Sequence, residues 1–233
     1  MSKSKDFATP VAIVVAGAVI ALALYFALSG KAQAPSANNP AGNGAAQEVS
    51  IRPIQKDDLV KGNKDAKIVI FEYSDTECPF CKNYHETMNK VIDEYGDNVA
   101  WVYRHFPLDQ LHPKARTEAR AVECAVKLAG PEKGFAYLDR LMELTPSNNG
   151  LDLKLLPEIA SYVGVDQTAF QSCMDKNETA DDVNADYDEA IKSGARGTPH
   201  NVIMVGEEKL VVPGGLPYEK MKQIIDELLT KVN

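Results

Sequence analysis

The chain has 233 residues, of which 25 are Lys or Arg and 33 are Asp or Glu, so its formal net charge is −8. This length allows one substantial domain with additional segments. The acidic balance argues against a nucleic-acid-binding protein, because such proteins present a basic face to the phosphates.

An apolar segment comes first along the chain. "VAIVVAGAVIALALYFAL", residues 11–28, contains eighteen apolar or small residues without a charge, about the minimum length of a membrane-spanning helix. Lys3 and Lys5 precede it, and the positive-inside rule then places the N-terminus in the cytoplasm. We therefore predict that residues 1–30 form a cytoplasmic tip and a single-pass transmembrane anchor, with the rest of the chain on the extracytoplasmic side.

A cleaved signal peptide is the alternative. "KAQA", residues 31–34, offers an A-x-A cleavage pattern, but the apolar run is long for a signal peptide and Pro35 would follow the cut. Both interpretations export the domain. Residues 31–47 are rich in Ala, Gly, Asn and Pro without an apolar face, and we interpret them as a flexible linker. The folded domain is then expected over residues 48–233.

The domain begins with a strand–helix–strand pattern. "KIVIFEYS", residues 67–74, is typical of a buried strand, and residues 98–106 read as a second one. Between them, apolar residues recur at spacings of three and four over residues 79–95, which indicates an amphipathic helix. Two strands joined by a helix are expected to be parallel.

The pattern then becomes helical. Five helices are expected near residues 114–129, 133–144, 152–163, 167–174 and 180–193. Strands return at 201–205 and 209–215, and a final amphipathic helix covers 217–232. We therefore predict one α/β domain with a helical insertion at about 114–190.

Four cysteines are present, and Cys78 and Cys81 form a C-x-x-C pair. A zinc site would need a second close pair of ligands, whereas Cys124 and Cys173 lie far apart. A structural staple across so short a loop would stabilise little. Neither alternative explains why the pair stands at the start of a helix.

A redox pair explains this position. Cys78 falls where a buried strand passes into a helix, and Pro79 suits the first helical position. Free backbone N–H groups and the helix dipole favour a thiolate there. Cys81, one turn later, can reach back and release a mixed disulfide. C-x-x-C in a βαβ pattern therefore indicates thiol–disulfide chemistry.

The residues "FEYSDTECPFC", followed by a helix and by "GTPH" far downstream, resemble the DsbA-like thiol–disulfide oxidoreductases of the thioredoxin superfamily. The resemblance covers about residues 47–233 and implies a thioredoxin fold with the family's helical insertion. It implies that Cys78 is the nucleophile and Cys81 the resolving cysteine. It also implies that Thr198 precedes a cis Pro199, which packs against the active-site disulfide.

Glu72 stands where this superfamily keeps a buried acid that helps to move protons. A solvent-facing strand carboxylate is the alternative, although apolar neighbours favour burial and a raised pKa. The chain departs from well-known members by having Pro-Phe between the cysteines, without a histidine, and by carrying His200 after the proline, as a tunable contact or a space-filling group.

Cys124 and Cys173 can be two buried thiols or a structural disulfide, which some relatives carry in the insertion. Unpaired thiols are a liability in an oxidising compartment, so we predict the disulfide.

The function expected from these observations is that of an exported enzyme that introduces disulfides into translocated proteins. No cofactor and no metal are predicted. The expected partners are unfolded or reduced exported polypeptides and, by the resemblance, a membrane quinone-linked thiol oxidase. A reductase or isomerase kept reduced by an electron donor, and a non-catalytic thioredoxin-like chaperone, are the alternatives.

Overall fold

A computed structural model of the protein describes residues 49–232. These residues lie within one compact unit, Glu48–Asn233. The anchor and linker predicted for residues 1–47 lie outside the described residues. None of the helices between residues 49 and 232 combines the length and the apolar character needed to cross a bilayer.

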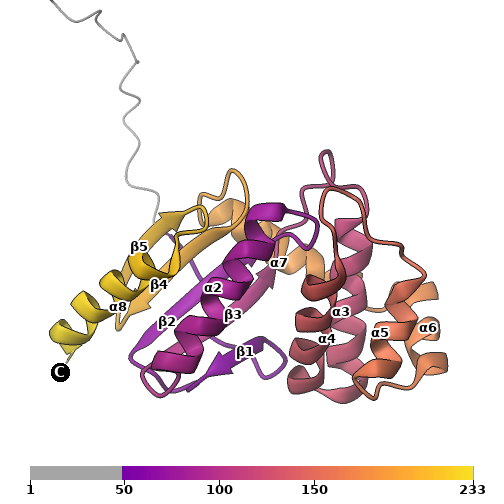
Figure 1. Cartoon of the computed structure of the whole chain (residues 1–233), viewed down its shortest axis with the longest axis horizontal. Helices are drawn as coiled ribbons and strands as arrows, with labels where there is room; N and C mark the ends of the chain where they lie inside the picture. Colours follow the sequence, from indigo (N-terminus) through magenta and orange to yellow (C-terminus); the bar gives the residue numbers. More distant parts are fainter. Residues whose placement is uncertain (1–48, 233) are drawn as a thin grey trace, which may run out of the picture. The chain divides into compact units, whose positions relative to one another are not determined.

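A five-stranded mixed sheet forms the centre of the domain (Figure 1). Its strand order is β1-β3-β2-β4-β5, and only β2 and β3 pair in parallel; the other neighbours are antiparallel. The middle strand β2 is buried on both faces, which accounts for its nearly continuous apolar sequence. The strands are β1 (Leu59–Gly62), β2 (Ile68–Ser74), β3 (Val99–His105), β4 (His200–Val205) and β5 (Glu208–Pro213).

Helices cover both faces of this sheet. On one face lie α2 (Pro79–Tyr95) and α8 (Tyr218–Val232), which contact each other. The buried side chains of α2 follow a helical stripe and share one core with Ile70 and Trp101 of the sheet. On the other face, α7 (Ala180–Lys192) packs through Ala190 against apolar side chains of β2, β3 and β4.

Four further helices make up the rest of the insertion. The helices α3 and α4 pack against each other so closely that a Cβ on Gly134 would lie 2.2 Å from Val126. The core of these helices is continuous with that under the sheet. These elements are α3 (Ala115–Ala129), α4 (Pro131–Leu144), α5 (Leu155–Tyr162) and α6 (Gln167–Asp175).

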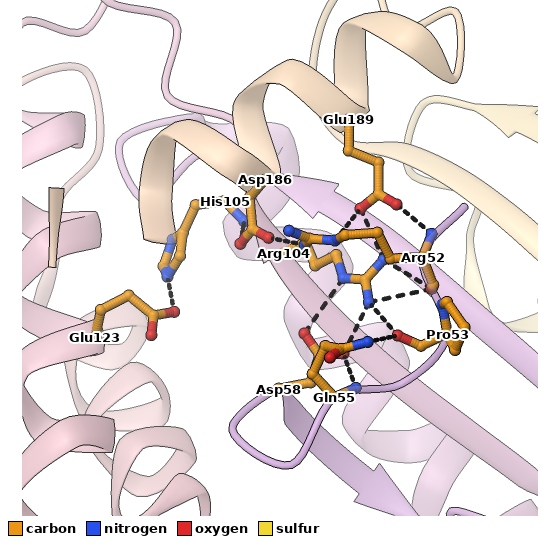
Figure 2. A network of polar contacts seen from close by, with 9 residues as sticks. All are labelled: Arg52, Pro53, Gln55, Asp58, Arg104, His105, Glu123, Asp186 and Glu189. Atoms are coloured by element: carbon orange, nitrogen blue, oxygen red, sulfur yellow. Dashed lines mark hydrogen bonds and ion pairs between the residues drawn. The ribbon is translucent and has the colours of Figure 1, made fainter. Parts of the chain in front are cut away.

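A buried arginine ties the N-terminal segment to the sheet and to α7 (Figure 2). Arg104 of β3 is fully buried and forms ion pairs of 2.7 Å with Asp58 and with Glu189. Its guanidinium also donates to the carbonyl oxygens of Arg52 and Pro53. Because a buried charge is tolerated only when it is paired and hydrogen-bonded, this network fixes the chain that leads into β1.

The predicted α/β architecture with a helical insertion is confirmed. The sequence analysis missed β1, which pairs antiparallel with β3 at the edge of the sheet. This strand has only four residues and one fully buried side chain, Leu59, so it carries no detectable alternation.

Candidate active site

The candidate site forms where β2 passes into α2. Cys78 is the N-cap residue, with extended backbone angles (φ −79°, ψ 122°), and Pro79 begins the helix. The chain before it is held by Asp75, whose backbone oxygen accepts from the Cys78 N–H at 3.1 Å and whose carboxylate accepts from the Glu77 N–H at 2.8 Å. Cys78 is therefore presented from a short, fully buried loop.

The sulfur of Cys78 lies against the loop that precedes β4. Its Sγ donates to the carbonyl oxygen of Thr198 at 3.6 Å, and this contact is only partly buried, although Cys78 as a whole is 4% exposed. The pKa of Cys78 is lowered to about 6, first by the hydrogen bond from the Cys81 thiol, then by the side chain of Thr198 and by the backbone N–H groups of Cys81 and Phe80, against the effect of burial. The sequence analysis named the helix N-terminus, but the neighbouring thiol contributes more.

Cys81 has the opposite environment. It is fully buried on the sheet side of α2, and burial together with the hydrogen bond to Cys78 raises its pKa well above the ordinary value. The two cysteines are not bonded to each other, so the structure describes the dithiol form. One sulfur is thus an anion near neutral pH while the other keeps its proton and donates it in a hydrogen bond.

The Thr198–Pro199 peptide bond is cis. The Pro199 carbonyl oxygen accepts from the Gly214 N–H at 2.8 Å, which ties this loop to the end of β5. His200 follows it as a buried residue beside the Tyr73 ring, with ring centroids 5.9 Å apart, and burial lowers its pKa.

Glu72 is fully buried rather than facing solvent. Its Oε2 accepts a hydrogen bond of 2.9 Å from the indole Nε1 of Trp101. Burial raises the pKa of Glu72 to about 7, with a smaller contribution from the charge of Cys78. A carboxyl group with such a pKa can give and take protons near neutrality.

The comparisons with known proteins fit this geometry. A family model described as thioredoxin matches residues 55–227. The chain belongs to the thioredoxin family. It resembles DsbA-like solved structures, and it is a thiol–disulfide oxidoreductase.

Solved structures of this family resemble the chain over most of its length. DsbA2 of Pseudomonas aeruginosa is 30% identical, with a TM-score of 0.63 over 77% of this chain and 97% of that one. BdbD of Bacillus subtilis is 23% identical, with a TM-score of 0.68 over 78% of this chain and 98% of that one, and supports the fold. The predicted thioredoxin fold is confirmed.

Curated relatives match over a shorter stretch. A Na(+)/H(+) antiporter NhaA 1 of Mycolicibacterium vanbaalenii is 45% identical over 76 residues, which are 32% of this chain and 12% of the antiporter. An NhaA 3 antiporter of Salinispora tropica is 30% identical over 149 residues, 63% of this chain and 22% of the antiporter. The matched part thus spans only a small fraction of each transporter.

Around the family's cysteine pair, Ser74 and Tyr103 were not singled out from the sequence. Both are buried, and neither hydroxyl has a hydrogen-bond partner among the residues described. Tyr103 is the register partner of Glu72, and the negative charges of Glu72 and Cys81 raise its pKa further than burial alone. The parallel register of the two strands was the one signal that could have pointed to Tyr103.

The other two cysteines lie in the insertion. Cys124 of α3 and Cys173 of α6 are joined by a disulfide, with an S–S distance of 1.97 Å and Cα atoms 6.0 Å apart. Both are buried, and the bond closes a separation of 49 residues.

Two large apolar side chains are exposed near the cysteine pair. Phe80, two residues after Cys78, is 69% exposed, and Leu111, in the loop before α3, is 66% exposed. The loop after α4 touches both regions, because Asn149 donates to the Leu111 oxygen and Asn148 donates to the Glu77 oxygen. Within residues 49–232, no cluster of three or more His, Cys, Asp or Glu side chains could hold a metal ion.

Proposed function

We propose that this oxidoreductase is an exported, membrane-anchored enzyme that introduces disulfides into translocated proteins through a Cys78–Cys81 redox pair. The observation that carries the proposal is the opposite shift of the two thiol pKa values, with Cys78 lowered to about 6 and Cys81 raised. Such a pair gives one reactive, stable thiolate and one protected thiol.

The reaction begins with the Cys78–Cys81 disulfide. A substrate thiolate attacks the Cys78 sulfur, a mixed disulfide forms, and Cys81 leaves and takes a proton. A second substrate thiolate then attacks the substrate sulfur of the mixed disulfide, and Cys78 leaves as a thiolate. The substrate loses two electrons and the enzyme gains them. In this scheme Glu72 supplies the proton that Cys81 needs, because its pKa of about 7 lets it exist in both forms at neutral pH.

Thr198 and Pro199 are assigned to the substrate side of the reaction. The Thr198 carbonyl oxygen lies 3.6 Å from the Cys78 sulfur, so the residue before Pro199 stands beside the reacting atom. The exposed ring of Phe80 offers apolar contact to an unfolded polypeptide.

The low pKa of Cys78 favours an oxidase because it stabilises the reduced enzyme. Relative to an ordinary thiol near 9, a pKa of about 6 stabilises the dithiol form at pH 7 by at most about 1.4 kcal/mol, or about 30 mV; solvent screening at the partly open site lowers this figure. The gap between a thioredoxin-like reductant and a DsbA-like oxidant is about 150 mV. The thiolate therefore accounts for about a fifth of that gap.

The location and the redox partner complete the proposal. Residues 1–30 would act as the anchor and residues 31–47 as the linker, which places the domain at the extracytoplasmic surface of the cell membrane. The reduced enzyme would be reoxidised by a membrane quinone-linked thiol oxidase. Reduced exported polypeptides would be the substrates.

Redox equilibration of the full-length chain with glutathione tests the role. A potential near about −120 mV supports the oxidase, whereas one near about −270 mV supports the alternative reductase or isomerase. Cys78→Ser separates both from a chaperone. We expect this variant to lose thiol–disulfide exchange activity. If the wild type and the variant both suppress aggregation and neither catalyses exchange, the result would favour the chaperone.

A further inference from the structure

Two buried carboxyl groups meet directly behind Cys78. Glu77 precedes Cys78 in the chain, whereas Glu118 comes from α3 in the insertion, and both side chains are fully buried. Oε2 of Glu118 accepts a hydrogen bond of 2.6 Å from the Thr76 hydroxyl. Oε1 of Glu118 has no donor among the residues described, and the carboxyl of Glu77 lies within hydrogen-bonding reach.

The groups around this carboxyl pair do not neutralise it. In the same loop, Asp75 is occupied by His112, whose Nδ1 lies 3.0 Å from its Oδ2. From the segment before α3, Lys114 donates to a backbone oxygen, and α4 contributes only the hydroxyl of Tyr137, which donates to another backbone oxygen. Within the described part of the chain, neither Glu77 nor Glu118 forms an ion pair.

Two adjacent buried carboxyl groups without a cation cannot both be ionised at low cost. Burial and the contact with Glu77 raise the pKa of Glu118 to about 9. At neutral pH the pair therefore holds one shared proton and one negative charge.

Glu77, one member of this pair, holds a strained loop. The carboxylate of Glu77 accepts from the backbone N–H groups of Gly150 and Leu151, at 3.2 and 3.3 Å, and its backbone oxygen accepts from Asn148 at 2.8 Å. Residues 147–149 have consecutive φ angles of 64°, 52° and 65°, although none of them is glycine. Such left-handed backbone persists only where surrounding contacts hold it, and Glu77 supplies three of them.

We propose that Glu118 is a positioning residue for thiol–disulfide exchange: the proton it shares with Glu77 locks the chain that enters Cys78 to the loop of residues 147–151. This inference rests on the proposed role of Cys78 as the nucleophile. With the lock intact, Cys78 stays where Cys81 and the start of α2 stabilise its thiolate. When the shared proton is lost, two carboxylates repel each other, the loop is released and Cys78 leaves that position.

Alkylation of Cys78 by iodoacetamide over pH 5 to 10 tests this inference. The full-length protein with a reduced active-site pair is used in mild detergent, and the modified residue is identified by mass. In the wild type we expect the rate constant to rise with a midpoint near pH 6, to level off, and to rise again near pH 9. The second rise should be on the order of tenfold, because a thiolate whose pKa returns toward 9 becomes more nucleophilic.

Two variants decide the origin of the second rise. Gln at position 118 can accept from Thr76 and donate to Glu77 but cannot ionise, so Glu118→Gln should keep the first midpoint and lose the second rise. Glu123→Gln is the matched control: Glu123 is another glutamate of α3, with a pKa raised to about 8 by burial, but it contacts His105. It should retain both rises. A second rise that persists in the Glu118 variant, or disappears in the Glu123 variant, overturns the proposal.

Hydrogen exchange of the wild type provides an independent measurement, and it decides the matter should a variant fail to fold. Protection of the Asn148, Gly150 and Leu151 amides should fall at the pH of the second rise. A second rise without this loss of protection overturns the proposal. Absence of the first midpoint would instead contradict the proposed role of Cys78, and the assay needs no protein partner, so the choice between oxidase and reductase does not affect it.

Discussion

The indole Nε1 of Trp101 donates a hydrogen bond of 2.9 Å to Oε2 of Glu72 between two central strands of the sheet. This bond favours the ionised carboxylate, yet burial outweighs it and raises the pKa of Glu72 to about 7. The ionised form of Glu72 therefore destabilises the folded protein.

Replacing Glu72 should therefore stabilise the protein at alkaline pH. When a carboxyl has a higher pKa in the folded than in the unfolded protein, the folded protein loses stability as pH rises from the unfolded pKa, about 4.5, to the folded pKa, about 7. Above the folded pKa the loss is complete. For Glu72 this amounts to about 3 kcal/mol at pH 8. We expect Glu72→Gln to unfold in urea with a free energy higher by about that amount at pH 8 and unchanged at pH 4.

The measurement is best made on the oxidised protein, in which Cys78 carries no charge and desolvation by burial, the largest cause of the shift, is tested by itself. Glu132→Gln, at an exposed position of α4, should change the unfolding free energy by less than about 0.5 kcal/mol at both pH values. An identical pH dependence in the wild type and the Glu72 variant would mean that folding does not shift the pKa of Glu72.

The reduction potential should change its pH dependence near pH 6. Below the pKa of Cys78, reduction takes up two protons with two electrons, and the potential falls by about 59 mV per pH unit. Above that pKa only Cys81 takes a proton, and the slope becomes about 30 mV per unit. The stabilisation of the reduced folded protein by the lowered pKa is complete above about pH 9 and is lost as pH falls through 6.

Equilibration with glutathione between pH 5 and 8 measures both slopes. Thiolate absorbance of the reduced wild type should give the same midpoint, and Cys78→Ser should lose the absorbance step. A single slope of about 59 mV per unit up to pH 8 would contradict a stable Cys78 thiolate.

The helices of the fold could be predicted because each carries its own local signal. The apolar stripe of α2 and the Gly130–Pro131 break before α4 depend on residues only a few positions apart, and the strands and helices expected over residues 67–232 are found within a few residues of their bounds. β1 could not be found in this way, because its four residues become a strand only by pairing with β3.

The same distinction applies to the site. The spacing of Cys78 and Cys81 indicates a redox pair, and the apolar neighbours of Glu72 indicate that it is buried. The contact between Glu118 and Thr76 joins residues 42 apart, and that between Arg104 and Glu189 joins residues 85 apart. No local sequence pattern predicts such pairs, because the residues come together and become buried only in the complete fold.

Removing the disulfide of the insertion should destabilise the protein. In the chain-entropy model, a loop of 49 residues between Cys124 and Cys173 corresponds to about 4 kcal/mol. We expect the double variant Cys124→Ala, Cys173→Ala to have a free energy of unfolding lower by this amount, measured in urea. The pH profile of Cys78 alkylation should stay unchanged. Cys78→Ala with Cys81→Ala is the control. Free thiols at both insertion positions of the native protein would contradict this prediction.

Arg104, drawn in Figure 2, should be among the positions where a substitution destabilises the fold most. Arg104→Met would leave the carboxylates of Asp58 and Glu189 near one another without their common cation, and breaking a buried pair in this way costs about 3–5 kcal/mol. Arg116→Met is the matched control, because Arg116 pairs with the exposed Asp109, and a surface pair contributes at most about 1 kcal/mol.

Urea unfolding of both variants measures these costs, and hydrogen exchange locates the effect. Because the Arg104 guanidinium donates to the backbone oxygens of Arg52 and Pro53, the amides of Arg52 and of residues 54–58 should exchange faster in the Arg104 variant and not in the Arg116 variant. Adding Glu189→Gln to Arg104→Met should restore part of the lost stability, since it removes one of the two carboxylates that lose Arg104 and leaves Asp58 without a second carboxylate nearby. Equal stability of the two single variants would show that the buried network does not hold the N-terminal segment against the sheet.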